Sequence, residues 1–474
     1  MRGFLASSIG VSCAAAALAA PLVLTASASA SPAVPAPPAA APKAAPGATQ
    51  SLPLVPLGSD RGLSRVPGEQ GLAKREVKPF SLLGVVWDDP DAELPGLVQV
   101  RTRDAATGRW SAWQGVETHN HEHAADPGSA ERGTGRRLRG GTAPLWVGAS
   151  DGVEVRVRPG GEAPADEPFA DENGQPVLPG GLHLELVDPG GSPGGTGARD
   201  AAEKAASRAN SPLAPLGATR LPARSAAEVR AEQGAKALPY AAAQPEIVTR
   251  RGWGADESIR EAEFLYTDTV KAAFVHHSAS GNNYSCADAP AMIRSIYRYH
   301  VESEGWRDIG YNFLVDKCGK VYEGRAGGVA KPVMGAHTLG FNENSTGVAV
   351  LGTFTDTEPP APAVEALKKL TAWKLGLTGA DPAGTTHLVS GGGNRYPKGQ
   401  NVPMKVISGH RDGFTTECPG TKLYDKLPGI RTGAAALQQR EPGEETEPGT
   451  GSGAGTTPGE PAASAEPAPA GPAR

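Results

Sequence analysis

Three tracts rich in alanine, proline and glycine constrain this chain most, because segments of that composition bury too little apolar surface to fold alone. They occupy residues 31–76, 190–243 and 431–474 of a 474-residue chain that holds 62 glycines and 44 prolines. We predict two linkers and a disordered tail in these tracts. Two ordered regions are left, at 77–189 and 244–430, each of ordinary domain size.

The first 30 residues have the pattern of an export signal. Arg2 precedes a stretch rich in Ala, Leu and Val, and small residues follow it at positions 26–30. The stretch is short and Ala-rich for a membrane span, which disfavours a transmembrane anchor. We therefore predict a signal peptide at 1–30, a secreted or cell-wall location, and no stable membrane anchor after cleavage.

The overall charge argues against one class of partner. The net charge is -5 and the pI is near 6.1, whereas nucleic-acid binding needs a basic surface that neutralises phosphates. We expect a monomer that does not bind nucleic acid.

The region at 77–189 predicts a β-rich accessory domain. Short alternating segments are separated by Asp-Pro, Pro-Gly and Thr-Gly breaks, which is typical of a small β-sandwich. Its tryptophans could stack on sugars, although tryptophans in small sandwiches more often lie in the core. They are Trp87, Trp110, Trp113 and Trp146.

Three histidines of this region alternate with other residues. On a strand, His119, His121 and His123 would share one face, so a metal site is conceivable. The residues that follow, 124–139, are polar and glycine-rich. We interpret the stretch as a solvated loop that binds no metal.

The region at 244–430 predicts an α/β fold with a mixed central β-sheet flanked by helices. A near-continuous apolar run predicts a strand covered on both faces, and apolar residues at i, i+3, i+4 and i+7 after Asp288 predict a helix. The predicted strands span 270–277, 312–315, 321–323 and 347–352, and a second helix spans 363–375.

An imidazole and a thiol lie close together near the end of this region, in His410 and Cys418, with glycine and proline nearby to form a loop. Both groups are preferred zinc ligands. A third ligand could come from His276 or His277 at the end of the apolar run, but neighbouring strand residues cannot both face one ion. Three protein ligands and an open position are the pattern of a catalytic zinc site.

The cysteines predict one disulfide. Removing a signal peptide removes Cys13 and leaves Cys286, Cys318 and Cys418, an odd number for an exported protein. Cys286 lies in a loop before a helix and Cys318 lies at a hairpin turn, so we predict that these two pair. Counting alone leaves all three pairings open, and the choice depends on where the other zinc ligands lie.

A series of ordered motifs runs through residues 245–430. They are Arg251-Gly252-Trp253-Gly254, His276-His277-Ser278-Ala279, the stretch 305–313, Val321-Tyr322-Glu323-Gly324-Arg325, Gly335-Ala336-His337, Gly409-His410-Arg411-Asp412 and Cys418-Pro419-Gly420. This part of the chain resembles peptidoglycan recognition proteins and the zinc-dependent N-acetylmuramoyl-L-alanine amidases that share their fold. The Trp-rich region before it resembles secreted actinobacterial members.

The resemblance implies a reaction and a set of roles. His276, His410 and Cys418 match the family's zinc ligands, and Tyr311 matches its catalytic tyrosine, whose hydroxyl stabilises the developing oxyanion. Thr416 is the second expected catalytic group, at a position where some relatives carry lysine. The implied reaction is hydrolysis of the amide between N-acetylmuramic acid and L-alanine in peptidoglycan.

Substrate contacts are expected from His337, Arg325 and Arg411. The stretch 326–333, which follows the Glu-Gly-Arg motif, differs from that of relatives that discriminate stem peptides, so the peptide type is not readable. Some members of the family have lost zinc ligands and only bind peptidoglycan, which is the alternative here. The complete ligand set favours an enzyme. A purely structural zinc site would need a fourth protein ligand, and none is apparent unless His277 turns inward.

Overall fold

A computed structural model describes residues 46–57, 68–160, 177–191, 200–234 and 239–440. The expected signal peptide at 1–30 lies outside the described residues, as does the tail beyond residue 440. Within the described ranges, no helix is both long enough and apolar enough to cross a membrane.

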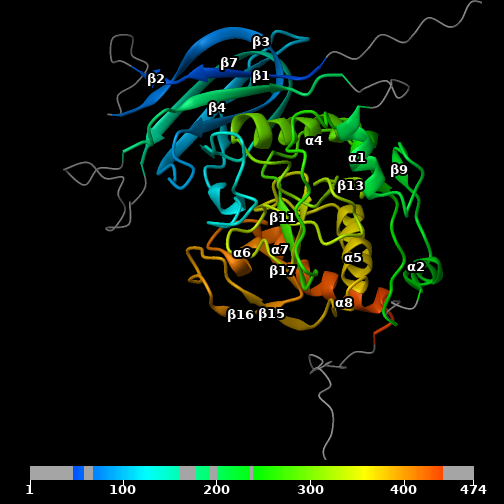
Figure 1. Ribbon diagram of the computed structural model, residues 1–474. Coiled ribbons are helices and arrows are strands. Elements are labelled where there is room, and N and C mark those ends of the chain that lie inside the picture. The colour runs from blue at the N-terminus through cyan, green and yellow to red at the C-terminus, as the bar shows by residue number, and fades with distance from the viewer. Residues whose placement is uncertain (1–45, 58–67, 161–176, 192–199, 235–238, 441–474) are drawn as a thin grey trace, which may run out of the picture. The chain divides into compact units, whose positions relative to one another are not determined.

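The described residues of the N-terminal domain form one eight-stranded sheet, and Figure 1 shows several of its strands lying side by side. Its strands are β1 (Ala48–Pro53), β2 (Val55–Pro56), β3 (Gln70–Trp87), β4 (Gly96–Asp104), β5 (Gln114–Val116), β6 (Gly140–Gly141), β7 (Leu145–Pro159) and β8 (His183–Asp188). The main order is β1-β8-β3-β7-β4-β5, and all these pairs are antiparallel. The pairing of β3 with β7 contains register shifts, which let these long strands bend.

The C-terminal domain is built on a mixed seven-stranded sheet, which confirms the predicted α/β class. Its order is β17-β11-β14-β12-β13-β10-β9. The strands are β9 (Arg220–Leu221), β10 (Ile247–Val248), β11 (Ala272–His277), β12 (Phe313–Val315), β13 (Val321–Glu323), β14 (Ser345–Val350) and β17 (Ile407–Gly409). A separate hairpin joins β15 (Thr385–Val389) to β16 (Asn401–Lys405).

Helices cover both faces of this sheet. The helices are α1 (Ala201–Ala209), α2 (Ala226–Gln233), α3 (Arg250–Trp253), α4 (Ala289–Arg298), α5 (Ala361–Gly376), α6 (His410–Gly413), α7 (Thr421–Tyr424) and α8 (Leu427–Leu437). Strand alternation divides the core: Val348 packs with α5 and α8, which lie together in Figure 1, whereas Ala349 packs with α4. Both faces are therefore apolar, as the continuous apolar run in β11 predicted.

The two domains share a hydrophobic core along α4. Val86 of β3 and Val187 of β8 belong to the same buried cluster as Ile293 and Ile296 of α4. In the π-helical turn that follows α4, the Tyr299 hydroxyl donates to the Thr142 carbonyl oxygen over 3.0 Å. The N-terminal sheet therefore docks directly on a helix of the C-terminal domain.

The structure differs from the sequence prediction within the alanine-rich tracts. Strand β1 and the first part of β3 lie inside the tract at 31–76, and α1 and α2 lie inside the tract at 190–243. Each is stabilised by a specific partner, such as β8 for β1 and the Asp200 side chain that caps α1. Likewise α8 extends past residue 431, where the tail was expected to begin.

The predicted disulfide is present. Cys286 and Cys318 are joined, which ties the loop before α4 to the turn between β12 and β13. Cys418 is the free, buried cysteine of the described residues.

Candidate metal centre

Two of the predicted ligands leave the sheet side by side. His276 lies at the end of β11, and His410 follows β17 as the first residue of α6. Because β11 and β17 are parallel neighbours, with Val275 opposite Gly409, both imidazoles emerge at the same sheet edge. Their ring centroids lie 4.6 Å apart.

Cys418 brings its sulfur to the same point. Its Sγ lies 3.7 Å from Nδ1 of His276. Two ligands of one tetrahedral zinc ion, at normal Zn–S and Zn–N bond lengths, would be about 3.5 Å apart. The loop is held by the Cys418 amide, which donates to the Thr416 hydroxyl over 3.1 Å.

The structure adds a fourth donor, His123 of the N-terminal domain. His123, His276, His410 and Cys418 are all buried, and one ligand atom from each lies within 4.8 Å of the others. The prediction of a solvated loop is therefore wrong for His123, which is only 5% exposed. A 3-10 turn at His121–His123 directs this one ring inward, whereas His119 is exposed.

Unpartnered nitrogens in the cluster indicate a metal site. Both ring nitrogens of His123 and Nδ1 of His410 are buried without a hydrogen-bond partner. Buried polar atoms are rarely left unpaired, because each costs about 1–3 kcal/mol. Three imidazoles and one thiol form a donor set that suits zinc, so the residues fit the ion that the sequence predicts.

The tautomer of His410 is set by the N-terminal domain. Its Nε2 lies 3.2 Å from the backbone carbonyl oxygen of Glu122, so Nε2 carries the proton and donates it. The Nδ1 lone pair is then free for a metal, which is how an outer carbonyl commonly orients a ligand histidine.

Burial keeps the imidazoles in the state that a metal needs. It lowers the pKa of His276 and His410 well below 6.5, with neighbouring histidines lowering it further, so both rings are neutral. Burial also raises the pKa of the Cys418 thiol, so binding of a metal would release its proton.

Two further histidines, His277 and His337, lie near the candidate ligands. His277 points away from the cluster and its Nδ1 accepts from the Phe354 amide over 3.3 Å, which agrees with a packing role. Nδ1 of His337 lies 3.0 Å from the Thr338 hydroxyl, which in turn lies 3.4 Å from Nε2 of His276. His337 is fully buried and is linked to His276 through the Thr338 hydroxyl; its substrate contact stays a prediction.

The two expected catalytic residues lie beside the cluster. The Tyr311 ring centroid is 5.5 Å from that of His276 and 5.9 Å from that of His123. Burial, followed by the Cys418 charge, raises the pKa of Tyr311 well above 10, so its hydroxyl keeps its proton. The Thr416 hydroxyl donates to the Glu122 carboxylate over 2.8 Å.

The two predicted substrate arginines differ in their surroundings. Arg325 is only 6% exposed and forms an ion pair with Glu131 of the N-terminal domain at 2.6 Å. Arg411 is partly exposed, lies over the Tyr424 ring at 4.9 Å, and forms an ion pair with Glu417.

Residues 117–139, which we call the covering segment, lie against the C-terminal domain over most of their length. Asn120 donates to the Glu304 carboxylate over 2.8 Å, and the Leu339 amide donates to the Glu122 carbonyl oxygen over 2.8 Å. Further along, Asp126 accepts from the Gly340 amide at 2.6 Å. The segment therefore closes over the metal cluster and is fixed on both sides of His123.

Sequence reasoning missed this arrangement because its signal was weak. The alternating histidines at 119–123 suggest a metal site, but nothing in the local sequence pattern indicates that they contact the C-terminal domain. The packing of β3 and β8 on α4 brings the segment to the C-terminal domain, and the segment's own hydrogen bonds fix it there.

The chain is thus an α/β protein with a buried cluster of three histidines and one cysteine, and comparison with known proteins identifies its family. Residues 266–421 match the family described as N-acetylmuramoyl-L-alanine amidase, and residues 35–176 match the family described as Rv3811 N-terminal galactose-binding domain-like. Peptidoglycan-recognition protein SC2 of Drosophila simulans is 31% identical over 181 residues, which are 38% of this chain and 84% of that protein. The chain belongs to the family of peptidoglycan recognition proteins and N-acetylmuramoyl-L-alanine amidases.

Two further similarities concern the same region. The N-acetylmuramoyl-L-alanine amidase of Homo sapiens is 33% identical over 189 residues, which are 39% of this chain and 28% of that protein. The solved structure of Drosophila PGRP-LB wild-type is 27% identical, covers 38% of this chain and 91% of that one, and gives a TM-score of 0.31.

Proposed function

We propose that the chain is a secreted, zinc-dependent N-acetylmuramoyl-L-alanine amidase that cleaves the amide between N-acetylmuramic acid and L-alanine in peptidoglycan. The observation that carries this proposal is the cluster of buried imidazole nitrogens without hydrogen-bond partners and the free thiol. The cluster lies at the edge of the C-terminal sheet, directly beside Tyr311. The match of residues 266–421 to the amidase family supports it.

The proposed roles follow from the positions of the side chains. His276, His410 and Cys418 would hold the zinc, which when bound supplies Lewis acidity to the scissile carbonyl and to water. Tyr311 keeps its proton because it is buried, so its hydroxyl can donate to the carbonyl oxygen as that oxygen becomes negative. Thr416 lies two residues before Cys418 in the same loop, and its hydroxyl can donate to the same oxygen. Unlike the lysine that some relatives carry at this position, it brings no charge.

Export is part of the proposal. The pattern at 1–30 supports a signal peptide, and the disulfide between Cys286 and Cys318 suits an oxidising compartment. The expected partner is a muramyl peptide of the cell wall.

The test is a digest of purified peptidoglycan with product analysis by mass spectrometry. Because His123 lies among the donors, the zinc-loaded chain and its His123→Ala variant are both assayed, each with a Cys418→Ala counterpart and with a chelator. Peptides that begin with a free L-alanine, lost in both controls, are the expected products. If neither protein releases them although both bind the wall, the chain is a recognition protein and the proposal is wrong.

A further inference from the structure

We propose that the chain, as folded, is a latent amidase: His123 provides the fourth metal ligand and the covering segment closes the substrate groove above it. This inference rests on the proposed zinc amidase function and adds a regulatory state to it.

The first argument is the origin of the ligands. His276, His410 and Cys418 lie inside the stretch that matches the amidase family, whereas His123 lies inside the stretch that matches a different family. Three protein ligands leave a position open for water and substrate, while four protein ligands close the site. The N-terminal domain therefore supplies the donor that turns an open site into a closed one.

The second argument is that the covering segment engages the groups expected to act on substrate. The Glu122 carboxylate accepts the Thr416 hydroxyl at 2.8 Å, and the Glu131 carboxylate pairs with Arg325 at 2.6 Å. Tyr311 is left only 4% exposed. Because Tyr311 and Arg325 are buried, a substrate could reach these two groups only after the segment has moved.

The third argument is that the segment is anchored without help from the metal. The Asp126 carboxylate accepts from the Gly340 amide at 2.6 Å and from the Asn342 side chain at 2.8 Å, and the Ala124 carbonyl oxygen accepts from Asn342 at 3.0 Å. These contacts hold His123 in place, so its position does not depend on a bound ion.

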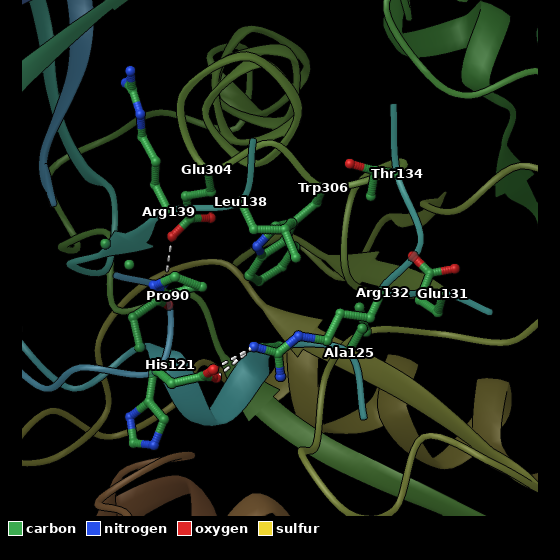
Figure 2. A pocket seen from close by; sticks show the side chains of 16 residues that line it. Pro90, His121, Ala125, Glu131, Arg132, Thr134, Leu138, Arg139, Glu304 and Trp306 are labelled. Atoms are coloured by element: carbon green, nitrogen blue, oxygen red, sulfur yellow. Dashed lines mark hydrogen bonds and ion pairs between the residues drawn. The ribbon is translucent and has the colours of Figure 1, made fainter. Parts of the chain in front are cut away.

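The fourth argument is that the closed arrangement leaves a buried polar atom unpaired, which favours opening. A small pocket lies between the segment and the C-terminal domain. Figure 2 shows Leu138 and Arg132 of the segment lining it together with Trp306 and Glu304. One carboxyl oxygen of Glu304 is buried without a hydrogen-bond partner, and such an atom disfavours the closed state by about 1–3 kcal/mol.

The consequence is a chain whose activity depends on displacement of the segment. If the closed state holds 90–99% of the molecules, releasing the segment should raise the rate about 10- to 100-fold. The metal need not leave, because three ligands stay in the C-terminal domain.

The experiment uses the full chain loaded with Co²⁺, whose absorption spectrum reports its ligands. Azide is added as a small probe that binds only at an open coordination position. We expect the spectrum of the native chain and of a His119→Ala control to be insensitive to azide, and that of His123→Ala to shift. His123→Ala should also release L-alanine peptides from peptidoglycan about 10- to 100-fold faster than the native chain.

A second variant keeps all four donors. Asp126→Ala removes an anchor of the segment, so its cobalt spectrum should become sensitive to azide and its hydrolysis should be faster than that of the native chain. A native spectrum that responds to azide as that of His123→Ala does would overturn the latent state but leave the amidase intact. An azide-sensitive His123→Ala variant that releases no peptide would instead sink the proposed amidase function, and a chain that binds no cobalt would sink both.

Discussion

The ion pair between Arg325 and Glu131 should control how easily the covering segment opens. Both side chains are about 4% exposed and their nearest atoms are 2.6 Å apart. Removing one partner of a buried pair costs about 3–5 kcal/mol, because the other charge is left buried. Arg325 keeps hydrogen bonds to the carbonyl oxygens of Ile309 and Met334, so we expect the lower end, about 3 kcal/mol, for Glu131→Ala.

This loss should appear as faster hydrogen exchange in the covering segment. A decrease of about 3 kcal/mol in the free energy of opening corresponds to roughly 100-fold faster exchange. Mass spectrometry of peptides from 120–139 measures it, and peptides from α5, whose Leu367 and Leu370 are fully buried, report global unfolding.

An exposed ion pair in the same segment provides the matched control. Arg132 contacts Asp91 at 2.5 Å, but the Asp91 side chain is 70% exposed. Such a pair contributes about 1 kcal/mol at most, so Asp91→Ala should accelerate exchange by no more than about fivefold. The reasoning is refuted if the two variants behave alike, or if exchange in α5 accelerates as much as exchange in the segment.

Three further predictions concern stability. Gly84→Ala would place a Cβ atom 2.4 Å from a tyrosine hydroxyl at the domain contact and should cost about 1–3 kcal/mol in urea unfolding, whereas Gly115→Ala, with nothing within 4 Å, should change stability by less than about 0.5 kcal/mol. Replacing Cys286 and Cys318 by serine should cost about 3–4 kcal/mol, given their separation of 32 residues, and lower the melting temperature by roughly 7–15 °C; an unchanged melting temperature would contradict this. Burial lowers the pKa of Lys374 from 10.5 to about 7, so the unfolded state binds more protons between these values and the free energy of unfolding should rise with pH across that window. Lys374→Met should remove that rise, and an identical pH dependence in both proteins would show that the lysine is not responsible.

The C-terminal sheet was readable from the sequence because its signals are local. The apolar run that forms β11 needs no partner to be recognised, and strand alternation already separated His276 from His277. Both inferences use residues that carry their own structural information. The pairing of Cys286 with Cys318 depended in addition on the assignment of Cys418 to the zinc site.

The remaining features depend on contacts between distant segments. Strand β1 has a sequence with little apolar alternation, and it is extended because its backbone pairs with β8. Helix α1 lies in a tract whose composition resembles a linker, and it is ordered because it packs on α3. His123 becomes a candidate ligand only because the N-terminal sheet docks on α4, which no local pattern encodes.

X-ray absorption at the zinc edge of the full chain tests most directly whether two domains share one metal centre. We predict a spectrum with one sulfur ligand and three imidazole ligands. His123→Ala should lose one imidazole and keep the sulfur, and Cys418→Ala should lose the sulfur. A native spectrum without sulfur, or one that His123→Ala leaves unchanged, would contradict the account.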